Sequence, residues 1–322
     1  MTVHSAPARD WAGYGASPPT GSWPGGARVA LNVVVNIEEG AERSYFDGDE
    51  CNEALVEMPR SVGPGVRDLA VESMYEYGSR AGIFRLLRLF ERVGVPTTAF
   101  AAARALERAP DVAEVLARSD HEVCAHGLRW SEAWQMPPEE ERAAIDQAVQ
   151  SITASVGRRP VGWYSRWMPS VHTRRLLVEE GGFLYDADAY NDDVPYYAPA
   201  GGRWHLVVPY SLSCNDGAYS YGHLTSPSDF VDYGWRALTY LLGEDDGTPR
   251  VLSIGLHPRI SGQPGRASAV AELLERAASM HAVWTATRQD IARFWLAEHP
   301  PPPEPPPAGD ATVGGAPPGS PA

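Results

Sequence analysis

Amide and carboxylate side chains gather where the first apolar run of this sequence ends. Residues 28–37 form that run, Asn36 lies near its end, and Glu38 and Glu39 follow it directly. Two neighbouring carboxylates repel each other in a concave site, and this repulsion raises the pKa of one of them. Such a pair suits one general base beside a metal ligand or an orienting group, although a solvated loop start would look the same.

Other chemically useful side chains also follow apolar stretches. His126 and His257 each come directly after such a stretch, as residues on an exposed rim would. Another stretch ends at Tyr164 and leads into Arg166, and a further one leads into an acidic segment that contains Asp188. Each residue alone has an ordinary structural explanation. Acidic, histidine and arginine residues at the ends of successive strands together predict an active site, with hydrolysis as its chemistry.

The elements that must position these residues alternate along the chain. Strands are predicted at residues 28–37, 97–101, 122–125, 161–164, 183–187, 206–210, 251–256 and 282–286. Helices are predicted between them, including one capped by Ser79 that ends at Gly94. This alternation indicates parallel βαβ units and fits one (β/α) barrel, in which chemistry collects at the carboxyl ends of the strands.

The two ends of the chain differ in composition from the middle. Residues 1–26 are rich in Pro, Gly and aromatic residues and are expected to form a lead-in. Residues 299–322 are rich in proline and are expected to be disordered, because they cannot bury enough apolar area to offset the cost of ordering. Residues 27–298 are therefore predicted to form a single catalytic domain.

Composition and charge exclude several classes of protein. The chain has 322 residues, 43% of them hydrophobic, so it can bury a sizeable core. No apolar run approaches the roughly 20 residues of a membrane-spanning helix, and the first ten residues lack the pattern of a secretory signal. With 27 basic and 41 acidic residues, the net charge of −14 disfavours a nucleic-acid partner.

The cysteines and the absence of lysine add two constraints. Cys51, Cys124 and Cys214 are widely spaced and contain no CxxC, which suggests reduced thiols and a cytoplasmic location. No lysine occurs anywhere in the sequence. Schiff bases, P-loops and metal pairs bridged by a carbamylated lysine are therefore excluded.

Taken together, these residues give the sequence a resemblance to the polysaccharide deacetylase superfamily, which comprises hydrolases on a deformed (β/α) barrel. The resemblance extends from about Trp23 to Trp295. It is similar in particular to the branch that contains the bacterial urate-pathway allantoinases and the cyclic imide hydrolases. The strings that carry this likeness are residues 36–40, 72–82, 126–130 and 255–257, of which 72–82 is the most specific.

The resemblance implies roles for the residues at the strand ends. In the sugar deacetylases an acidic pair supplies the base and a metal ligand, two histidines complete the metal site, and a late histidine is the general acid. By this likeness Glu38 or Glu39 activates water, and His257 protonates the leaving nitrogen. His126 either polarises the carbonyl or holds a metal. Without a metal, Arg166 or backbone N–H groups would stabilise the oxyanion.

One metal ligand of the family is missing. Trp130 stands where the second metal histidine would be, and an indole offers no lone pair to a cation. Glu39 and His126 remain, whereas catalytic zinc usually keeps three protein ligands, and Asp188 or another acidic residue could supply the third. In the allantoinase branch this tryptophan accompanies proposed catalysis without a metal. The expected cofactor is therefore none or a single divalent metal, with zinc the first choice.

The predicted substrate pocket has aromatic walls. Trp130, Tyr164 and Trp167 are expected to enclose a small flat ring, with Asn36 and Asp188 as further substrate-binding residues. After the Trp-Tyr pair, allantoinases of the branch typically carry Thr-Gly-Arg. Here a single serine precedes the arginine, and the bulky Trp-Met pair follows. This departure changes the pocket wall and leaves a ureide, a cyclic imide or an N-acetyl group open as substrate.

The resemblance implies a hydrolase of carbon–nitrogen bonds other than peptide bonds. The favoured reaction is the opening of an allantoin-like cyclic ureide or cyclic imide by a carboxylate-activated water. The alternative is a metal-dependent N-deacetylase of an amino sugar or a small amide. A scaffold protein that lost its chemistry is a third possibility, and the retained acidic pair and His257 argue against it. A small-molecule substrate, no nucleic-acid or membrane partner and, by family resemblance, a homotetramer are expected.

Overall fold

The apolar run that precedes the acidic pair forms a strand that pairs with three other strands of the sheet. In the computed structural model, which describes residues 9–55, 58, 60 and 62–303, this run forms β1 (Val29–Ile37) and is buried along its whole length. Parallel strands covered on both faces read as continuous apolar runs, because neither face meets water. The predicted strand at residues 28–37 is therefore confirmed to within one residue.

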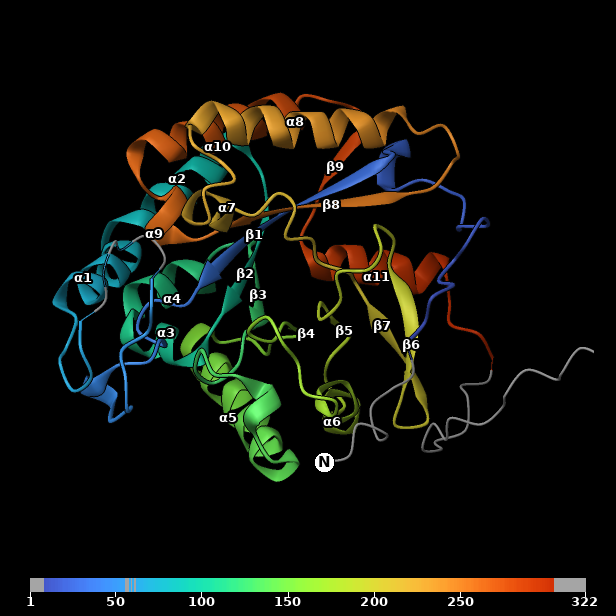
Figure 1. Ribbon diagram of the computed structural model, residues 1–322. Helices are drawn as coiled ribbons and strands as arrows, with labels where there is room; N and C mark the ends of the chain where they lie inside the picture. Colours follow the sequence, from blue (N-terminus) through green and yellow to red (C-terminus); the bar gives the residue numbers. More distant parts are fainter. Residues whose placement is uncertain (1–8, 56–57, 59, 61, 304–322) are drawn as a thin grey trace, which may run out of the picture.

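Nine strands form one curled sheet with the order β6-β7-β5-β4-β3-β2-β1-β8, and β9 also pairs with β1 (Figure 1). All neighbouring strands are parallel except β6 and β7, which are antiparallel. Among the described residues no strand joins β6 to β8, so the barrel stays open there. This single-domain arrangement confirms the predicted deformed (β/α) barrel. The remaining strands are β2 (Thr97–Ala101), β3 (Glu122–Ala125), β4 (Gly162–Trp163), β5 (Tyr185–Asp186), β6 (Tyr196–Ala200), β7 (Arg203–Val207), β8 (Arg250–Leu256) and β9 (Val283–Thr285).

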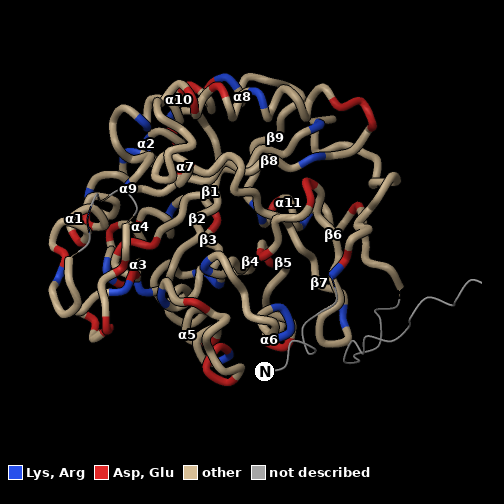
Figure 2. Tube along the Cα trace, viewed as in Figure 1, with Lys and Arg blue, Asp and Glu red and all other residues tan. Residues whose placement is uncertain are grey.

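Helices surround this sheet (Figure 1). Acidic and basic residues are interspersed along the outer α8 and α10, as Figure 2 shows, and include the ion pair between Asp232 and Arg236 at 2.7 Å. The longer helices are α1 (Leu69–Tyr77), α2 (Ile83–Val93), α3 (Ala103–Arg108), α4 (Pro110–Ala117), α5 (Pro138–Val156), α6 (Thr173–Glu180), α8 (Pro227–Gly243), α10 (Pro264–Ala278) and α11 (Arg288–Glu298). Two four-residue helices, α7 (Gly217–Ser220) and α9 (Pro258–Ser261), were not predicted. No helix in the described residues is both long and apolar enough to span a bilayer.

The prediction that a helix begins at Ser79 is wrong. The helix begins earlier, where Asp68 caps α1 by accepting a hydrogen bond from the N–H of Val71 at 3.0 Å. A π-helical turn, Gly78–Gly82, then joins α1 to α2 without a break, so Ser79 lies inside a continuous helix. The end at Gly94 is confirmed, with this glycine in the left-handed conformation at φ 68°.

The described part of the lead-in lies against the barrel. The hydroxyl of Tyr14 donates to the carbonyl of Pro195 at 2.7 Å, and the ring of Trp23 lies 5.7 Å from that of Trp295. The predicted disordered tail lies outside the described residues from position 304 onward. The division into lead-in, catalytic barrel and tail stays a prediction.

Candidate active site

A cavity of about 430 Å³ lies at the carboxyl ends of the parallel strands. Barrel enzymes have their active sites at this end. The strands there fix the position of the first loop residues, while the rest of each loop can vary. The predicted residues that line the cavity are Asn36 near the end of β1, Glu38 after β1, His126 and Trp130 after β3, Tyr164 and Trp167 after β4, and His257 after β8.

Glu38 is the carboxylate at the centre of this group. Its side chain is almost fully buried, and Oε1 lies 3.6 Å from Nε2 of both His126 and His257. Its Oε2 accepts a hydrogen bond of 2.9 Å from the Arg259 guanidinium. Burial acts to raise the pKa of Glu38, but the interactions with His257 and His126 outweigh it and hold that pKa well below its usual range. Glu38 is therefore an ionised carboxylate between two imidazoles.

His257 is held by a buried carboxylate on its other side. Its Nδ1 lies 2.6 Å from Oδ1 of Asp216, and its backbone N–H donates to Oδ2 of the same residue at 2.7 Å. Burial alone would lower the pKa of His257, but the carboxylates of Glu38 and Asp216 raise this pKa to about 10. His257 is therefore an imidazolium at neutral pH, with Nε2–H directed toward Glu38.

His126 has a different partner and a different role. Its Nδ1 lies 2.8 Å from the carbonyl oxygen of Tyr164, and because a carbonyl only accepts, Nδ1 carries the proton. Its ring stacks on the Tyr164 ring at 5.1 Å with an interplanar angle of 9°. These two contacts fix the ring and leave Nε2 facing Glu38 and the cavity.

The second carboxylate of the acidic pair lies behind the cavity wall. Glu39 is not a lining residue, and it accepts hydrogen bonds from the backbone N–H of Glu38 at 3.1 Å and of Arg259 at 3.3 Å. Burial raises the pKa of Glu39 to about 7, with Arg259 acting in the opposite direction and Glu38 adding to the rise. A Cβ at Gly78 would collide with the Glu39 side chain, so the π-helical turn packs directly against this carboxylate.

Arg166 was predicted to stabilise the oxyanion and Asp188 to contact the substrate. Neither residue lines the cavity. Arg166 donates to the carbonyl of Trp130 at 2.7 Å and to Glu53 at 2.9 Å, and its guanidinium stacks 3.8 Å over the Trp130 ring. Asp188 accepts from the backbone N–H and the hydroxyl of Ser165 at 2.7 and 2.8 Å. Both residues therefore hold the segment after β4 in place, and their direct roles stay predictions.

Sequence reasoning missed Asp216, which stands in an Asn-Asp-Gly sequence that also suits an ordinary turn and follows no predicted strand. Arg259 follows the same predicted strand as His257, so the strand end places it at the rim, but no role was predicted for it. Both are buried and both contact a predicted catalytic residue.

The described side chains do not fit a divalent metal of the predicted kind. Among these residues no group of three or more His, Cys, Asp or Glu side chains is placed to hold an ion. Of the two predicted ligands, His126 lines the cavity and Glu39 does not, and the guanidinium of Arg259 already contacts Glu38. We therefore derive no step through a metal, and the cofactor prediction of none or zinc stays a prediction.

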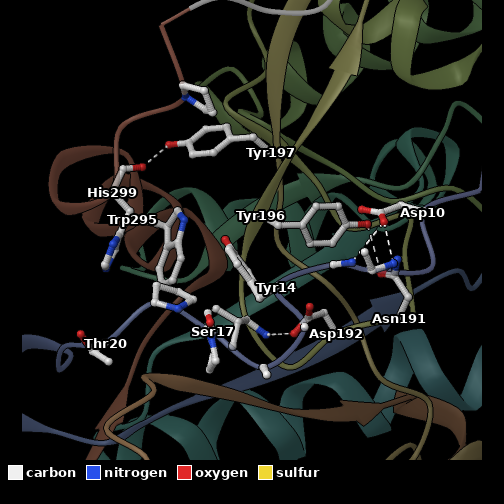
Figure 3. Close-up of a pocket in the computed structure, with 18 of the residues that line it drawn as sticks. Asp10, Tyr14, Ser17, Thr20, Asn191, Asp192, Tyr196, Tyr197, Trp295 and His299 are labelled. Atoms are coloured by element: carbon white, nitrogen blue, oxygen red, sulfur yellow. Dashed lines mark hydrogen bonds between the residues drawn. The ribbon is translucent and has the colours of Figure 1, made fainter.

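A larger cavity, of about 1290 Å³, lies elsewhere on the molecule between the lead-in and β6. Figure 3 shows that Tyr14, Tyr196, Tyr197 and Trp295 point toward it. Its hydrogen bonds serve the packing of chain segments, such as that from the hydroxyl of Tyr197 to the carbonyl of His299 at 2.7 Å. None of the predicted catalytic residues lines it.

An open barrel with a carboxylate between two histidines at its strand ends has the features of a hydrolytic enzyme. The chain belongs to the polysaccharide deacetylase family. The model of the family, described as polysaccharide deacetylase, matches residues 66–169. A Schizosaccharomyces pombe protein with a provisional polysaccharide deacetylase description is 36% identical over 91% of this chain and 98% of its own length.

Solved structures agree with this assignment. A Pseudomonas aeruginosa PAO1 structure, described as a probable polysaccharide deacetylase, is 45% identical with a TM-score of 0.86, over 91% of this chain and 99% of its own. The structure titled PuuE allantoinase is 44% identical with a TM-score of 0.86, over the same shares of the two chains. The protein is accordingly a hydrolase that acts on carbon–nitrogen bonds other than peptide bonds.

Proposed function

We propose that this hydrolase opens a small cyclic ureide or cyclic imide, of the allantoin type, by adding water to a ring carbonyl. The observation that carries the proposal is the position of the ionised Glu38 between the two imidazoles in a cavity of about 430 Å³. The 44% identity to the allantoinase structure over 91% of this chain supports the choice of ring.

Glu38 is the general base in this proposal. Its ionised carboxylate takes a proton from water while the water oxygen forms a bond to the ring carbonyl carbon. His126, whose Nδ1 donates to the Tyr164 carbonyl, directs its Nε2 toward Glu38 and helps to orient that water. Positioned proton transfer of this kind contributes about a hundredfold to ten-thousandfold to a rate.

His257 is the general acid. When the carbon–nitrogen bond breaks, its Nε2 proton passes to the leaving ring nitrogen, which becomes a neutral amide or urea group. The carbonyl carbon becomes a carboxylic acid, which releases its own proton to solvent as a carboxylate forms. Asp216 holds the imidazolium by two contacts and keeps the proton available at neutral pH. The proton on Glu38 then restores the imidazolium, and the two residues return to their starting states.

The tetrahedral oxyanion requires a positive or donor group in the cavity. Arg259 and Asn36 both line the cavity, and Asn36 donates its amide to the carbonyl of Leu256 at 3.1 Å. We assign stabilisation of the oxyanion to the Arg259 guanidinium, because Arg259 lines the cavity and contacts the general base, Glu38. Arg166, the candidate from sequence, does not line the cavity and stacks on the Trp130 ring, which does.

Turnover of allantoin and succinimide, with metal analysis of the same sample, tests this function. Ring opening of either compound, unchanged after chelation, is the expected result. Stoichiometric metal, chelator-sensitive activity and acetate release from an N-acetylated amino sugar would instead support the metal-dependent N-deacetylase. No turnover of any ring would overturn the proposal.

The wider biological setting is also proposed rather than observed. A small-molecule substrate, no nucleic-acid or membrane partner, a cytoplasmic location and a homotetramer remain predictions from sequence and family resemblance. Light scattering of the purified full-length chain measures the last of these directly, and a monomer at micromolar concentration would contradict it.

A further inference from the structure

Apolar side chains with high exposure form the outer part of the catalytic cavity. Trp167, Leu212 and Tyr221 line the same cavity as Glu38. Their exposed fractions are nevertheless high, at 43%, 51% and 61% respectively. Large exposed apolar side chains at the mouth of a site indicate that something apolar covers them in use. No step of the proposed reaction uses these three residues.

The backbone of Trp167 is strained in a way that fixes its ring at this mouth. Among the described residues it is the only non-glycine residue with positive φ, at 52°, a conformation that costs about 1–2 kcal/mol. Its ring packs edge-on against Trp130 at 5.3 Å and stacks 4.5 Å from the Arg166 guanidinium. The hydroxyl of Tyr190 donates to its carbonyl at 3.2 Å. Strain held in place by several contacts at a cavity mouth points to a binding role.

The apolar surface continues inward from the mouth. Leu212 and Tyr221 come from the segment between β7 and α8, and the buried Leu55 and Ile260 extend the lining toward the catalytic group. With Trp167, a substituent on the reacting ring therefore meets apolar side chains from four separate segments. The polar side chains that line the cavity beside Tyr221 are Ser220 and His223, so a polar substituent would lose water there for few matching partners.

The size of the cavity also favours a substituted ring. At about 30 Å³ per water-sized group, a cavity of about 430 Å³ holds on the order of 14 non-hydrogen atoms. An unsubstituted five-membered ureide or imide has about seven, so roughly half of the space would remain. The remaining part includes the apolar mouth.

We propose that the enzyme prefers cyclic ureides or imides that carry an apolar, preferably aromatic, ring substituent, and that Trp167, Leu212 and Tyr221 determine this preference. The inference rests on the proposed ring-opening function and specifies its substrate class. Burial of the substituent against these side chains stabilises the bound ring in both the ground state and the transition state, so it acts on kcat/KM.

The test compares kcat/KM for hydantoin, 5-phenylhydantoin and allantoin, whose substituents are hydrogen, aromatic and polar. The wild type is expected to prefer the phenyl compound over hydantoin by at least about tenfold. Leu212→Ala and Trp167→Ala should each lower this ratio several-fold. Tyr240→Ala is the matched control, because this exposed aromatic lies on α8 outside the cavity and should leave the ratio as in the wild type.

The outcomes separate this inference from the function on which it rests. If hydantoin is opened but the phenyl compound is not preferred, or allantoin is preferred, the substituent preference is wrong while ring opening stands. If no ring is opened, the proposed function fails and the inference fails with it. Acetate release from N-acetylated sugars, with loss in Trp167→Ala, would show that the exposed aromatic rim stacks on sugar rings instead.

Discussion

Two buried clusters of the barrel each contain a glutamate and an arginine, but the groups that surround these residues differ. At the carboxyl ends of β1 and β8, Glu38 contacts Arg259 and faces the cavity. Near the amino end of β3, Glu122 accepts hydrogen bonds from the hydroxyls of Tyr185 at 2.7 Å and Thr98 at 2.9 Å. A third donor, the backbone N–H of Gln289, lies 2.9 Å from the same carboxylate.

The arginine near Glu122 also directs its terminal nitrogens at protein groups. Arg288 is fully buried and donates to the hydroxyl of Ser253 at 3.0 Å and to the carbonyl of Pro209 at 2.6 Å. Neither Glu122 nor Arg288 lines either cavity. Burial of a Glu and an Arg does not therefore distinguish catalysis from support. What distinguishes the catalytic cluster is one side that faces a cavity rather than protein donors.

The largest expected effect comes from the base. Glu38→Gln removes the carboxylate that lies 3.6 Å from both imidazoles, so kcat should fall by about a thousandfold while the fold is kept. Ring-opening rates with circular dichroism of the variant check this result.

Glu39→Gln is the neighbouring control for that variant. Because Glu39 does not line the cavity, its loss should lower kcat by at most about tenfold, through the position of Glu38. A loss in Glu39→Gln as large as in Glu38→Gln would make Glu39 the base.

The next effect concerns the acid. Asp216→Asn removes a carboxylate that raises the pKa of His257 to about 10, so this pKa should fall in the variant. The wild type should keep kcat/KM up to about pH 10, whereas the alkaline limb of the variant should begin at lower pH. At neutral pH we expect a loss of about a hundredfold. A pH profile with an unchanged alkaline limb would remove Asp216 from the control of His257.

The same coupling bears on stability. The folded-state pKa of His257 lies above its unfolded value, so its contribution is present in full below the unfolded value and is lost as pH rises through about 10. The wild type should therefore lose more unfolding free energy between neutral pH and pH 10 than Asp216→Asn does.

The strands of the barrel could be predicted well because their pattern has one physical cause. β2 (Thr97–Ala101) and β3 (Glu122–Ala125) match their predicted ranges, since both are short apolar runs bounded by turns. β6 (Tyr196–Ala200) was missed and β7 was placed too late, because this antiparallel hairpin is half-buried and its alternation is weak. Tertiary packing decides the length of such strands, and sequence period alone does not show it.

The site could be predicted in part for the same reason. Glu38, His126 and His257 follow their strands directly, so the strand ends place them. Asp216 lies after an irregular segment, and the neighbouring Asn215 forms an isolated bridge with Gly255 of β8, which is far away in sequence. Arg166 was predicted to stabilise the oxyanion. The spacing of residues along the chain cannot show that this side chain stacks on Trp130 and does not line the cavity.

A smaller effect is expected from a change at Gly82. This residue ends the string 72–82, the most specific of those that resemble the family, and it packs against the segment that follows β8. A Cβ at Gly82 would collide with the carbonyl oxygen of Pro258, directly after His257. Gly82→Ala should therefore cost about 1–3 kcal/mol of unfolding free energy and lower kcat roughly tenfold by displacing His257. Gly243→Ala is the control, because nothing lies within 4 Å of its added Cβ. Equal, small effects of both variants would show that this packing does not position the acid.

The smallest effect on turnover is expected at the amino end of β3. Glu122→Gln replaces one of two accepting oxygens by an NH₂ group, which then faces donors from Tyr185 or from Thr98 and Gln289. Mismatched buried donors cost about 1–3 kcal/mol, so thermal and denaturant unfolding should show a clear loss of stability. Since Glu122 lines neither cavity, kcat measured well below the midpoint of unfolding should stay at the wild-type value. A folded Glu122→Gln variant with kcat reduced as far as in Glu38→Gln would contradict the division of the barrel into a supporting end and a catalytic end.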